Sequence, residues 1–162
     1  MAEHDIFHQI LKLVQDAGVW HESFEHTTTV RTSEEAAALR PDYTLAEGAK
    51  ALIVRVKIPH VGKKFVQAVL PGDKKFDSKK LKLAAGANDL RFATEAEVAE
   101  ITGGVRPGGV PPFGNLFGIE VYADNGIFEN ERIIFNAGRD ASIAMTSEDY
   151  KLLVKPFIAD IV

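Results

Sequence analysis

Apolar residues recur at helical spacing near the start of the chain, which predicts a helix over residues 5–17 that ends at Gly18. Capping boxes at Thr32-Ser33-Glu34-Glu35 and at Thr94 with Glu97 predict two further helix starts, the first in a short helix that ends at Pro41. A short basic helix is expected from Ser78 to Ala85, closed by Gly86, and Thr146 is expected to cap a final helix.

Alternation of apolar and polar residues predicts a strand from Lys50 to Ile58, paired with Phe65–Leu70 across a tight turn. The other expected strands are Trp20–His26, Leu116–Ala123, Ile127–Phe128, Arg132–Asn136 and Ser142–Met145, with a turn at Asp124-Asn125-Gly126. Strands and helices intermix without a regular βαβ repeat. The sequence therefore predicts an α+β fold, in which a mixed, largely antiparallel curved sheet or barrel is flanked by helices.

Composition narrows the classes of protein that fit this pattern. The chain has 162 residues, 46% hydrophobic and 26% charged, which is typical of one globular domain, and we expect a single freestanding domain over residues 1–162. The absence of cysteine excludes disulfides, thiolate metal sites and a cysteine nucleophile. The N-terminus lacks the pattern of a signal peptide and no apolar run has the length of a membrane span, so a cytoplasmic protein without a membrane partner is expected.

Charge is distributed unevenly along the chain. The net charge is −4, but residues 50–91 hold eleven Lys or Arg against three acids, while the rest of the chain holds eight basic and twenty acidic residues. A cationic stretch on an acidic body suits a polyphosphate partner held in one orientation. A solvated lysine-rich face would show the same pattern. Few aromatic residues interleave the lysines, so stacking on single-stranded bases is not indicated.

The most unusual segment runs from Gly103 to Gly114, where eight of twelve residues are glycine or proline. Neither a helix nor a central strand tolerates that composition, but a rigid turn that presents backbone N–H groups to a ligand does. A plain connector between a helix and a strand is the alternative interpretation. Loops carry function more often than cores do, which favours a binding loop.

Lys50 is the residue that fits its predicted strand least well. Period-2 alternation puts it on the same face as Leu52, Val54, Val56 and Ile58, where an ammonium group is costly unless it meets an anion or a polar partner. A bulge at position 50, or a side chain that reaches solvent from the first residue of the strand, are the alternatives. Other motifs are excluded: His21 and His26 are five residues apart and cannot share a metal, and neither a phosphate loop with Lys-Ser/Thr nor a Gly-x-Ser-x-Gly elbow is present.

Several segments together resemble the YbaK/EbsC-type aminoacyl-tRNA deacylases, a family that includes the editing domain inserted in bacterial prolyl-tRNA synthetases. The matching segments are Phe24-Glu25-His26, Thr32-Ser33-Glu34-Glu35-Ala36-Ala37, Lys50 before Ala51-Leu52-Ile53-Val54, Asp77-Ser78-Lys79-Lys80-Leu81, Ile101-Thr102-Gly103, Gly108-Gly109-Val110-Pro111-Pro112-Phe113-Gly114 and Gly138-Arg139-Asp140-Ala141-Ser142-Ile143. The lysine before an apolar strand and the Gly-x-x-x-Pro loop are the most specific of these.

The resemblance implies hydrolysis of the ester between a mischarged amino acid and tRNA, most often tRNA for proline, by water and without metal or organic cofactor. It implies that Lys50 holds the terminal phosphate or ribose, and that the backbone of the loop beginning at Gly108 holds the carbonyl oxygen and stabilises developing charge. The substrate-binding residues implied are His26, Gly109, Val110, Pro111, Pro112, Asn136, Gly138 and Ser142. Lys63, Lys64, Lys79, Lys80 and Lys82 are candidates for tRNA contacts. The implied partners are aminoacyl-tRNA and, as a further candidate, prolyl-tRNA synthetase, but not DNA.

Three positions depart from the family pattern: Ala51 stands where many members have threonine, Asn136 where some have serine or histidine, and Ser142 where the cysteine-releasing branch has aspartate. These departures favour removal of alanine or another small amino acid over a cysteine-specific mechanism. A non-catalytic tRNA- or synthetase-binding module of the same fold is the alternative function. An esterase acting on another small acyl ester is a third hypothesis, which the basic stretch disfavours.

Overall fold

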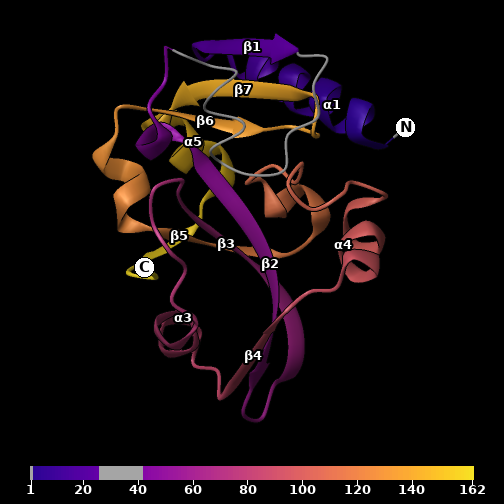
Figure 1. Cartoon of the computed structure of the whole chain (residues 1–162), viewed down its shortest axis with the longest axis vertical. Coiled ribbons are helices and arrows are strands. Elements are labelled where there is room, and N and C mark those ends of the chain that lie inside the picture. Colours follow the sequence, from indigo (N-terminus) through magenta and orange to yellow (C-terminus); the bar gives the residue numbers. More distant parts are fainter. Residues whose placement is uncertain (1, 26–41) are drawn as a thin grey trace.

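The computed structural model describes residues 2–25 and 42–162. Its helices are α1 (Ala2–Ala17), α3 (Ser78–Ala85), α4 (Glu95–Thr102) and α5 (Ser147–Val154), with short 3-10 helices η1 (Leu45–Glu47), η2 (Gly114–Phe117) and η3 (Asn125–Glu129). Its strands are β1 (His21–Glu25), β2 (Ala49–Ile58), β3 (Gly62–Pro71), β4 (Asp89–Phe92), β5 (Glu120–Asp124), β6 (Arg132–Asn136), β7 (Ala141–Thr146) and β8 (Phe157–Ala159). Figure 1 shows their arrangement.

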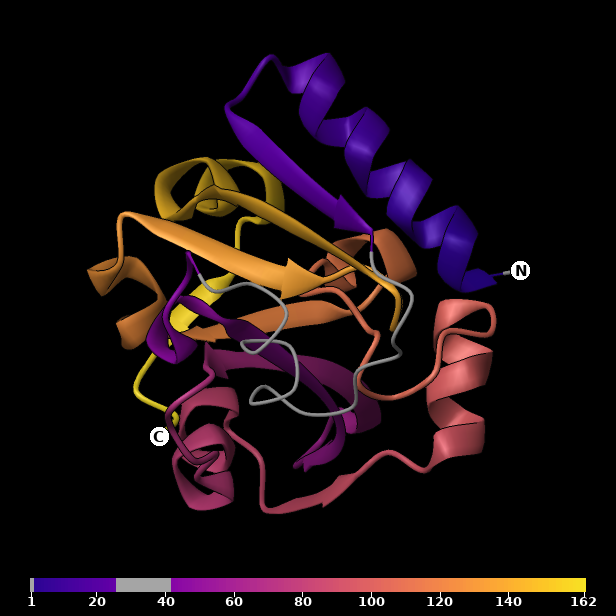
Figure 2. The same ribbon diagram turned by 45° about the horizontal axis from the view of Figure 1, so that its top comes forward.

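The strands form two sheets that share one interior. One sheet has the order β1-β7-β6 and is antiparallel, and the other has the order β4-β2-β3-β5-β8, with parallel pairing of β5 to both β3 and β8. A parallel bridge between Gly48 and Ile134 joins the two sheets where β2 begins. Figure 2 shows the strands curving around a common interior, with α1 and α3 at opposite ends of the molecule. The expected mixed sheet flanked by helices is confirmed.

The main core lies on the inner side of both sheets. It combines Ile53, Val69 and Val121 with Ile133 and Ile143, and the apolar face of α1 packs against it. The outer side of the five-stranded sheet is covered as well, because Val54 and Val56 pack with Leu81 of α3. Both faces of β2 are therefore buried along its middle. The alternation in the sequence predicts burial of the even-numbered face alone, because Arg55 and Lys57 interrupt the apolar character of the other face.

Capping residues in the sequence correctly predicted where several helices begin and end. Asp77 caps α3, Thr94 and Glu97 form the expected capping box of α4, and Gly86 ends α3 in the left-handed conformation. The helices that begin at Ser78 and Ser147 and the strand Arg132–Asn136 lie where they were expected. The predictions for His26 and for residues 32–41 lie outside the described residues.

Two strand predictions were wrong in part. Ile127 and Phe128 belong to η3, because Asp124 accepts a hydrogen bond from the Gly126 N–H and starts a 3-10 turn that turns Ile127 into the core. The strand expected from Leu116 begins only at Glu120, after η2. Strands β4 and β8 were not expected from the sequence; they have four and three residues, too few for a clear alternation. None of the helices in the described residues is long and apolar enough to span a membrane.

Candidate active site

The glycine- and proline-rich loop is held by hydrogen bonds to its carbonyl oxygens. Gly108 has a φ of +90°, a conformation that favours glycine, and it opens a turn in which successive carbonyl groups find donors. The carbonyl oxygens of Pro107, Gly108, Gly109, Pro111 and Pro112 each accept a hydrogen bond from another part of the chain. The loop is thus a fixed backbone surface and not a loose connector.

Two buried side chains hold the loop from the core. The Gln67 amide, 0% exposed on β3, donates to the Pro111 carbonyl at 2.9 Å and accepts from the Gly114 N–H at 2.8 Å. The Tyr150 hydroxyl of α5 donates to the Pro112 carbonyl at 2.6 Å, and its burial raises the pKa of the hydroxyl. Phe113 packs between Phe135 and Tyr150 inside the core. The proline end of the loop therefore faces the interior.

The turn between β6 and β7 holds the glycine end of the loop. Asn136 donates from Nδ2 to the Gly108 carbonyl at 2.7 Å, and the Gly138 N–H donates to the Gly109 carbonyl at 2.7 Å. Arg139 donates from Nε to the Pro107 carbonyl at 2.9 Å. A Cβ on Gly109 would lie 2.8 Å from backbone atoms of Gly138 and Arg139, so this close approach of two backbones requires glycine there.

These hydrogen bonds fix the directions of the remaining N–H groups. In a trans peptide the C=O of one residue and the N–H of the next point in opposite directions. The Pro107 and Gly109 carbonyls point to the β6–β7 turn, so the N–H groups of Gly108 and Val110 point away from it. Val110 is 7% exposed, and its N–H donates to no residue of the described ranges. A nearly buried N–H is rarely left without a partner, so the lack of an acceptor among the described residues makes the Val110 N–H a candidate donor to a ligand oxygen.

Lys50 lies at the edge of the same region. The parallel bridge pairs Gly48 with Ile134, so Lys50 and Asn136 follow two residues later on their respective strands. Residues two apart on a strand share a face, which puts Lys50 and Asn136 on the outer side of the joined sheets. Lys50 is half-buried, and its side chain forms no hydrogen bond or ion pair within the described part of the chain.

Ser142 lies beside Asn136 on the neighbouring strand β7. It pairs directly with Asn136 in the β6–β7 ladder, and its hydroxyl donates to Asn136 Oδ1 at 3.4 Å. Ser142, Asn136 and Lys50 therefore follow one another across three adjacent strands, and Asn136 links the row to Gly108. The register thus brings together Lys50, Asn136, Gly138, Ser142 and the loop. His26, the remaining expected substrate contact, lies outside the described residues.

The segment before Lys50 is anchored to β6 by Arg132. Its guanidinium donates to Glu47 at 2.8 Å and to the Asp42 carbonyl at 2.7 Å, and it lies 3.9 Å from the centre of the Tyr43 ring. Burial raises the pKa of Tyr43, and a hydrogen bond to Glu22 raises it further. These contacts fix the chain immediately before the strand that carries Lys50.

The five lysines expected to contact tRNA are not equivalent. Lys64 pairs with Glu120 at 2.5 Å, and Lys80 pairs with Asp160 at 3.0 Å. Lys63 is exposed near the β2–β3 turn, whereas Lys79 and Lys82 lie on α3, on the outer side of the sheet. These lysines belong to one basic stretch of the sequence, but the fold places them on different surfaces of the protein.

Sequence reasoning missed the residues that support the loop. Gln67, Tyr150 and Arg139 were not singled out, although the sequence offered one signal, a glutamine within the apolar run Phe65–Leu70. In the described ranges no group of three or more His, Cys, Asp or Glu side chains could hold a metal ion.

Comparison with known proteins gives one consistent result. The family model of the aminoacyl-tRNA editing domain matches residues 27–152. The multifunctional Ser/Thr-tRNA deacylase ProXp-y of Escherichia coli (strain K12) is 33% identical over 159 residues, which cover 96% of this chain and 93% of that protein. The proline–tRNA ligase of Stenotrophomonas maltophilia is 30% identical over 136 residues, covering 83% of this chain and 23% of the ligase.

Solved structures agree with the sequence matches. The crystal structure of a hypothetical protein superimposes with a TM-score of 0.79 at 26% identity, covering 94% of this chain and 97% of that one. The crystal structure of a candidate trans-editing enzyme for prolyl-tRNA synthetase superimposes with a TM-score of 0.73 at 25% identity, covering 87% of this chain and 85% of that one.

Proposed function

Because this chain belongs to the aminoacyl-tRNA editing domain family, we propose that it hydrolyses the ester bond of mischarged aminoacyl-tRNAs. The observation that carries the proposal is the row of Lys50 and Asn136 beside a loop whose Val110 N–H has no acceptor among the described residues. A cation and an oriented N–H group are what an ester between a nucleotide and an amino acid requires. The nucleotide brings a phosphate and the ester brings a carbonyl oxygen.

In this proposal Lys50 and the loop have separate roles. The Lys50 ammonium holds the terminal phosphate or ribose of the tRNA and so fixes the position of the ester. The N–H groups of Gly108 and Val110 hold the carbonyl oxygen and stabilise the negative charge that develops when water attacks. Their hydrogen-bonded scaffold is formed in advance, so little reorganisation is needed during the reaction.

We propose a small amino acid on tRNA for proline as the substrate. The similarity to prolyl-tRNA ligases supports this tRNA, and the Ser/Thr-tRNA deacylase ProXp-y supports a small side chain. Val110, Pro111 and Pro112 are buried, so the loop is stiff and apolar at this end. In this proposal the loop forms one wall of a small pocket, which would exclude large side chains sterically but separate small ones only weakly, by about 1–3 kcal/mol per methylene.

Incubation with a panel of aminoacyl-tRNAs tests the proposal directly. Wild-type protein should release alanine, serine or threonine from tRNA for proline while sparing prolyl-tRNA and tRNAs charged with aromatic residues. Lys50→Ala should lower turnover by orders of magnitude without unfolding, because its neighbours on the strand keep their packing. Lys12→Ala, at an exposed position of α1, is the matched control and should retain full activity.

A non-catalytic binding module is the second candidate function. It requires that the protein bind uncharged and charged tRNA alike and release no amino acid from any of them. Rapid hydrolysis by a correctly folded Lys50→Ala variant would remove Lys50 from the catalytic assignment. Release of an aromatic amino acid with alanyl-, seryl- and threonyl-tRNA untouched would refute the proposed substrate class.

A further inference from the structure

The candidate active site lies where the two sheets meet at one backbone bridge. Among the described residues, Gly48 and Ile134 alone form a bridge between strands of the two sheets. Lys50 follows Gly48 on one side of this junction, and Asn136 follows Ile134 on the other. No ladder between β2 and β6 continues beyond the bridge in the described ranges. The position of Lys50 relative to Asn136 therefore depends on how the junction is held.

The pairing of β2 within its own sheet does not set this position. Lys50 pairs with Leu70 of β3, which fixes it inside the five-stranded sheet. On the opposite edge, β2 pairs with β4 only from Val54 onward. Of the strands that the structure describes, none therefore pairs with the first residues of β2 on the edge that faces β6.

Two side chains at the beginning of β6 hold the chain segment that leads to the bridge. Arg132 donates from Nε to Glu47 at 2.8 Å and from Nη2 to the Asp42 carbonyl at 2.7 Å. Asn130 donates from Nδ2 to the Ala46 carbonyl at 2.9 Å. We call Arg132 and Asn130 the junction clamp. Its three hydrogen bonds tie η1 and the residues before it to the sheet that carries Asn136.

A guanidinium suits this position because it forms several contacts at once. Its planar fork reaches the Glu47 carboxylate and a backbone carbonyl together, while its face lies 3.9 Å from the centre of the Tyr43 ring. Burial opposes ionisation of Glu47, but hydrogen bonds from Thr44 and Arg132 hold its pKa below the usual value. Glu47 also completes a capping box with Thr44, so Arg132 binds a carboxylate that is itself fixed.

The junction clamp and the candidate site lie on opposite sides of the bridge. Arg132 precedes Ile134 by two residues and Asn136 follows it by two, which is about 7 Å in each direction at roughly 3.3 Å per residue. Without the clamp, the segment before Lys50 can shift against β6, because the bridge is then the remaining backbone link in the described ranges. A misplacement of about 1 Å can lower a reaction rate about 100-fold.

We propose that Arg132 is a positioning residue for deacylation, which sets the place of Lys50 relative to Asn136 and the loop that begins at Gly108. This inference rests on the proposed deacylase function and adds a residue that acts without touching the ester. The guanidinium is engaged by Glu47 and by a backbone carbonyl, so its effect falls on turnover and not on tRNA affinity.

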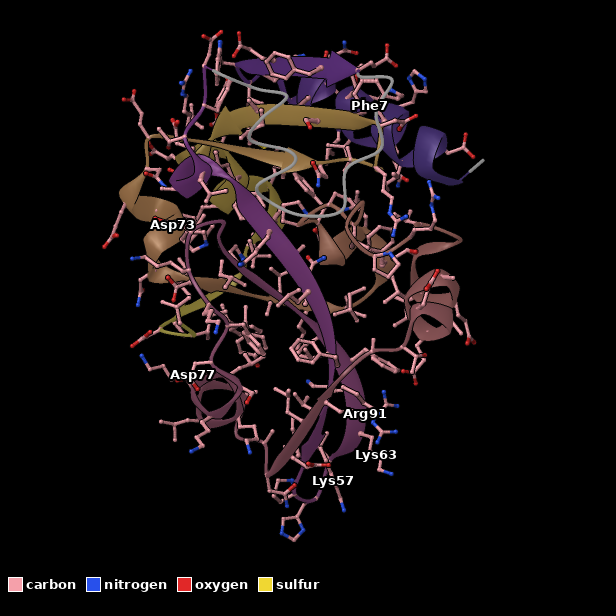
Figure 3. All side chains as sticks on the ribbon, viewed as in Figure 1. Phe7, Lys57, Lys63, Asp73, Asp77 and Arg91 are labelled. Atoms are coloured by element: carbon pink, nitrogen blue, oxygen red, sulfur yellow. The ribbon has the colours of Figure 1, made fainter. Side chains whose placement is uncertain are left out.

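A second arginine–glutamate pair provides a matched control. Arg91 binds Glu97, and both Glu97 and Glu47 complete capping boxes at the start of a helix. The side chains of Arg91 and Arg132 are 38% and 37% exposed. Figure 3 shows Arg91 toward the free end of the β2–β3 hairpin, at the opposite end of β2 from Lys50. The two pairs are therefore alike in local structure and differ in their distance from the site.

Turnover, tRNA binding and thermal stability are measured on Arg132→Met and Arg91→Met. Methionine keeps much of the side-chain length but removes the charge and every donor. Arg132→Met should lower kcat on aminoacyl-tRNA by about 10- to 100-fold and leave KM and the affinity for deacylated tRNA within about twofold of wild type. Arg91→Met should retain the wild-type kcat. The two variants should have similar melting temperatures, because a partly exposed ion pair contributes little to stability.

A double variant tests whether Arg132 acts through Lys50. In a Lys50→Ala background, with enzyme in excess over aminoacyl-tRNA, Arg132→Met should cause little further loss, because no ammonium is left to misplace. A wild-type kcat in Arg132→Met, an equal loss in Arg91→Met, a fall in tRNA affinity as large as the fall in kcat, or a full further loss in the Lys50→Ala background would overturn the proposal. Wild-type protein that hydrolyses no aminoacyl-tRNA would instead refute the deacylase function itself, and this inference with it.

Discussion

Replacing Gln67 by Met should uncouple the loop from the core with little change in side-chain volume. The glutamine amide is fully buried, and its two ends satisfy the Pro111 carbonyl and the Gly114 N–H. Methionine offers neither a donor nor an adequate acceptor, so both backbone groups lose their partners. No water can replace the amide without a cavity, and methionine leaves little space for one.

The expected magnitude follows from these two orphaned groups. Each buried polar group left without a partner costs about 1–3 kcal/mol, so Gln67→Met should lower the free energy of unfolding by about 2–6 kcal/mol. A protein of this size has a total stability of about 5–15 kcal/mol, so the variant remains folded at room temperature unless the loss is at the top of its range and the stability at the bottom of its own. Deacylation should fall further than the folded fraction does, because the Val110 N–H lies one residue before Pro111.

Urea unfolding followed by far-ultraviolet circular dichroism measures the stability, and kcat and KM are measured under conditions where the variant is folded. Gln67→Glu provides a second test. Its carboxylate still accepts from Gly114 but, when ionised, cannot donate to Pro111, and burial raises the pKa of such a carboxyl group. A raised folded-state pKa makes the variant most stable below about pH 4.3, with stability lost as the pH rises toward neutrality.

Two results would contradict this reasoning. A stability loss below about 1 kcal/mol in Gln67→Met would mean that the two hydrogen bonds contribute little or that the loop finds other partners. A Gln67→Glu variant whose stability does not fall between pH 5 and pH 8 would show that the position is not a buried acceptor–donor bridge.

The remaining predictions concern the loop and one surface ion pair. Gly109→Ala should abolish deacylation and lower the melting temperature, because its Cβ would lie 2.8 Å from the facing backbone. Gly103→Ala is the control, since it introduces only left-handed backbone strain of about 1–2 kcal/mol. Equal effects of the two substitutions would contradict this prediction. Tyr150→Phe should cost about 1–3 kcal/mol in urea unfolding through the orphaned Pro112 carbonyl. The Arg91 guanidinium, through its hydrogen bonds, holds the pKa of Glu97 at about 2. The Arg91–Glu97 ion pair therefore stabilises the fold above about pH 4.5, and this contribution is lost as the pH falls toward 2. The melting temperature of Glu97→Gln should vary less over that pH range than the melting temperature of wild type.

The sequence by itself determined the features that depend on neighbouring residues. Thr94 and Glu97 lie three apart and cap a helix within one turn, and Gly86 ends a helix because left-handed backbone suits glycine. The alternation after Lys50 is a period of two, which is a property of the strand itself. The Gly-x-x-x-Pro loop was recognisable because its composition excludes regular structure.

Tertiary structure alone decided how these parts meet. The Gly48–Ile134 bridge brings Lys50 beside Asn136 across 86 residues of chain, and no local pattern encodes a pairing at that separation. Gln67 supports a loop 44 residues away because both lie on the same side of a curved sheet. The basic stretch became two surfaces because α3 covers one face of β2 while Arg55 and Lys57 lie on the other. Local chemistry sets the conformation of each segment, whereas the active-site geometry depends on which apolar faces are buried together.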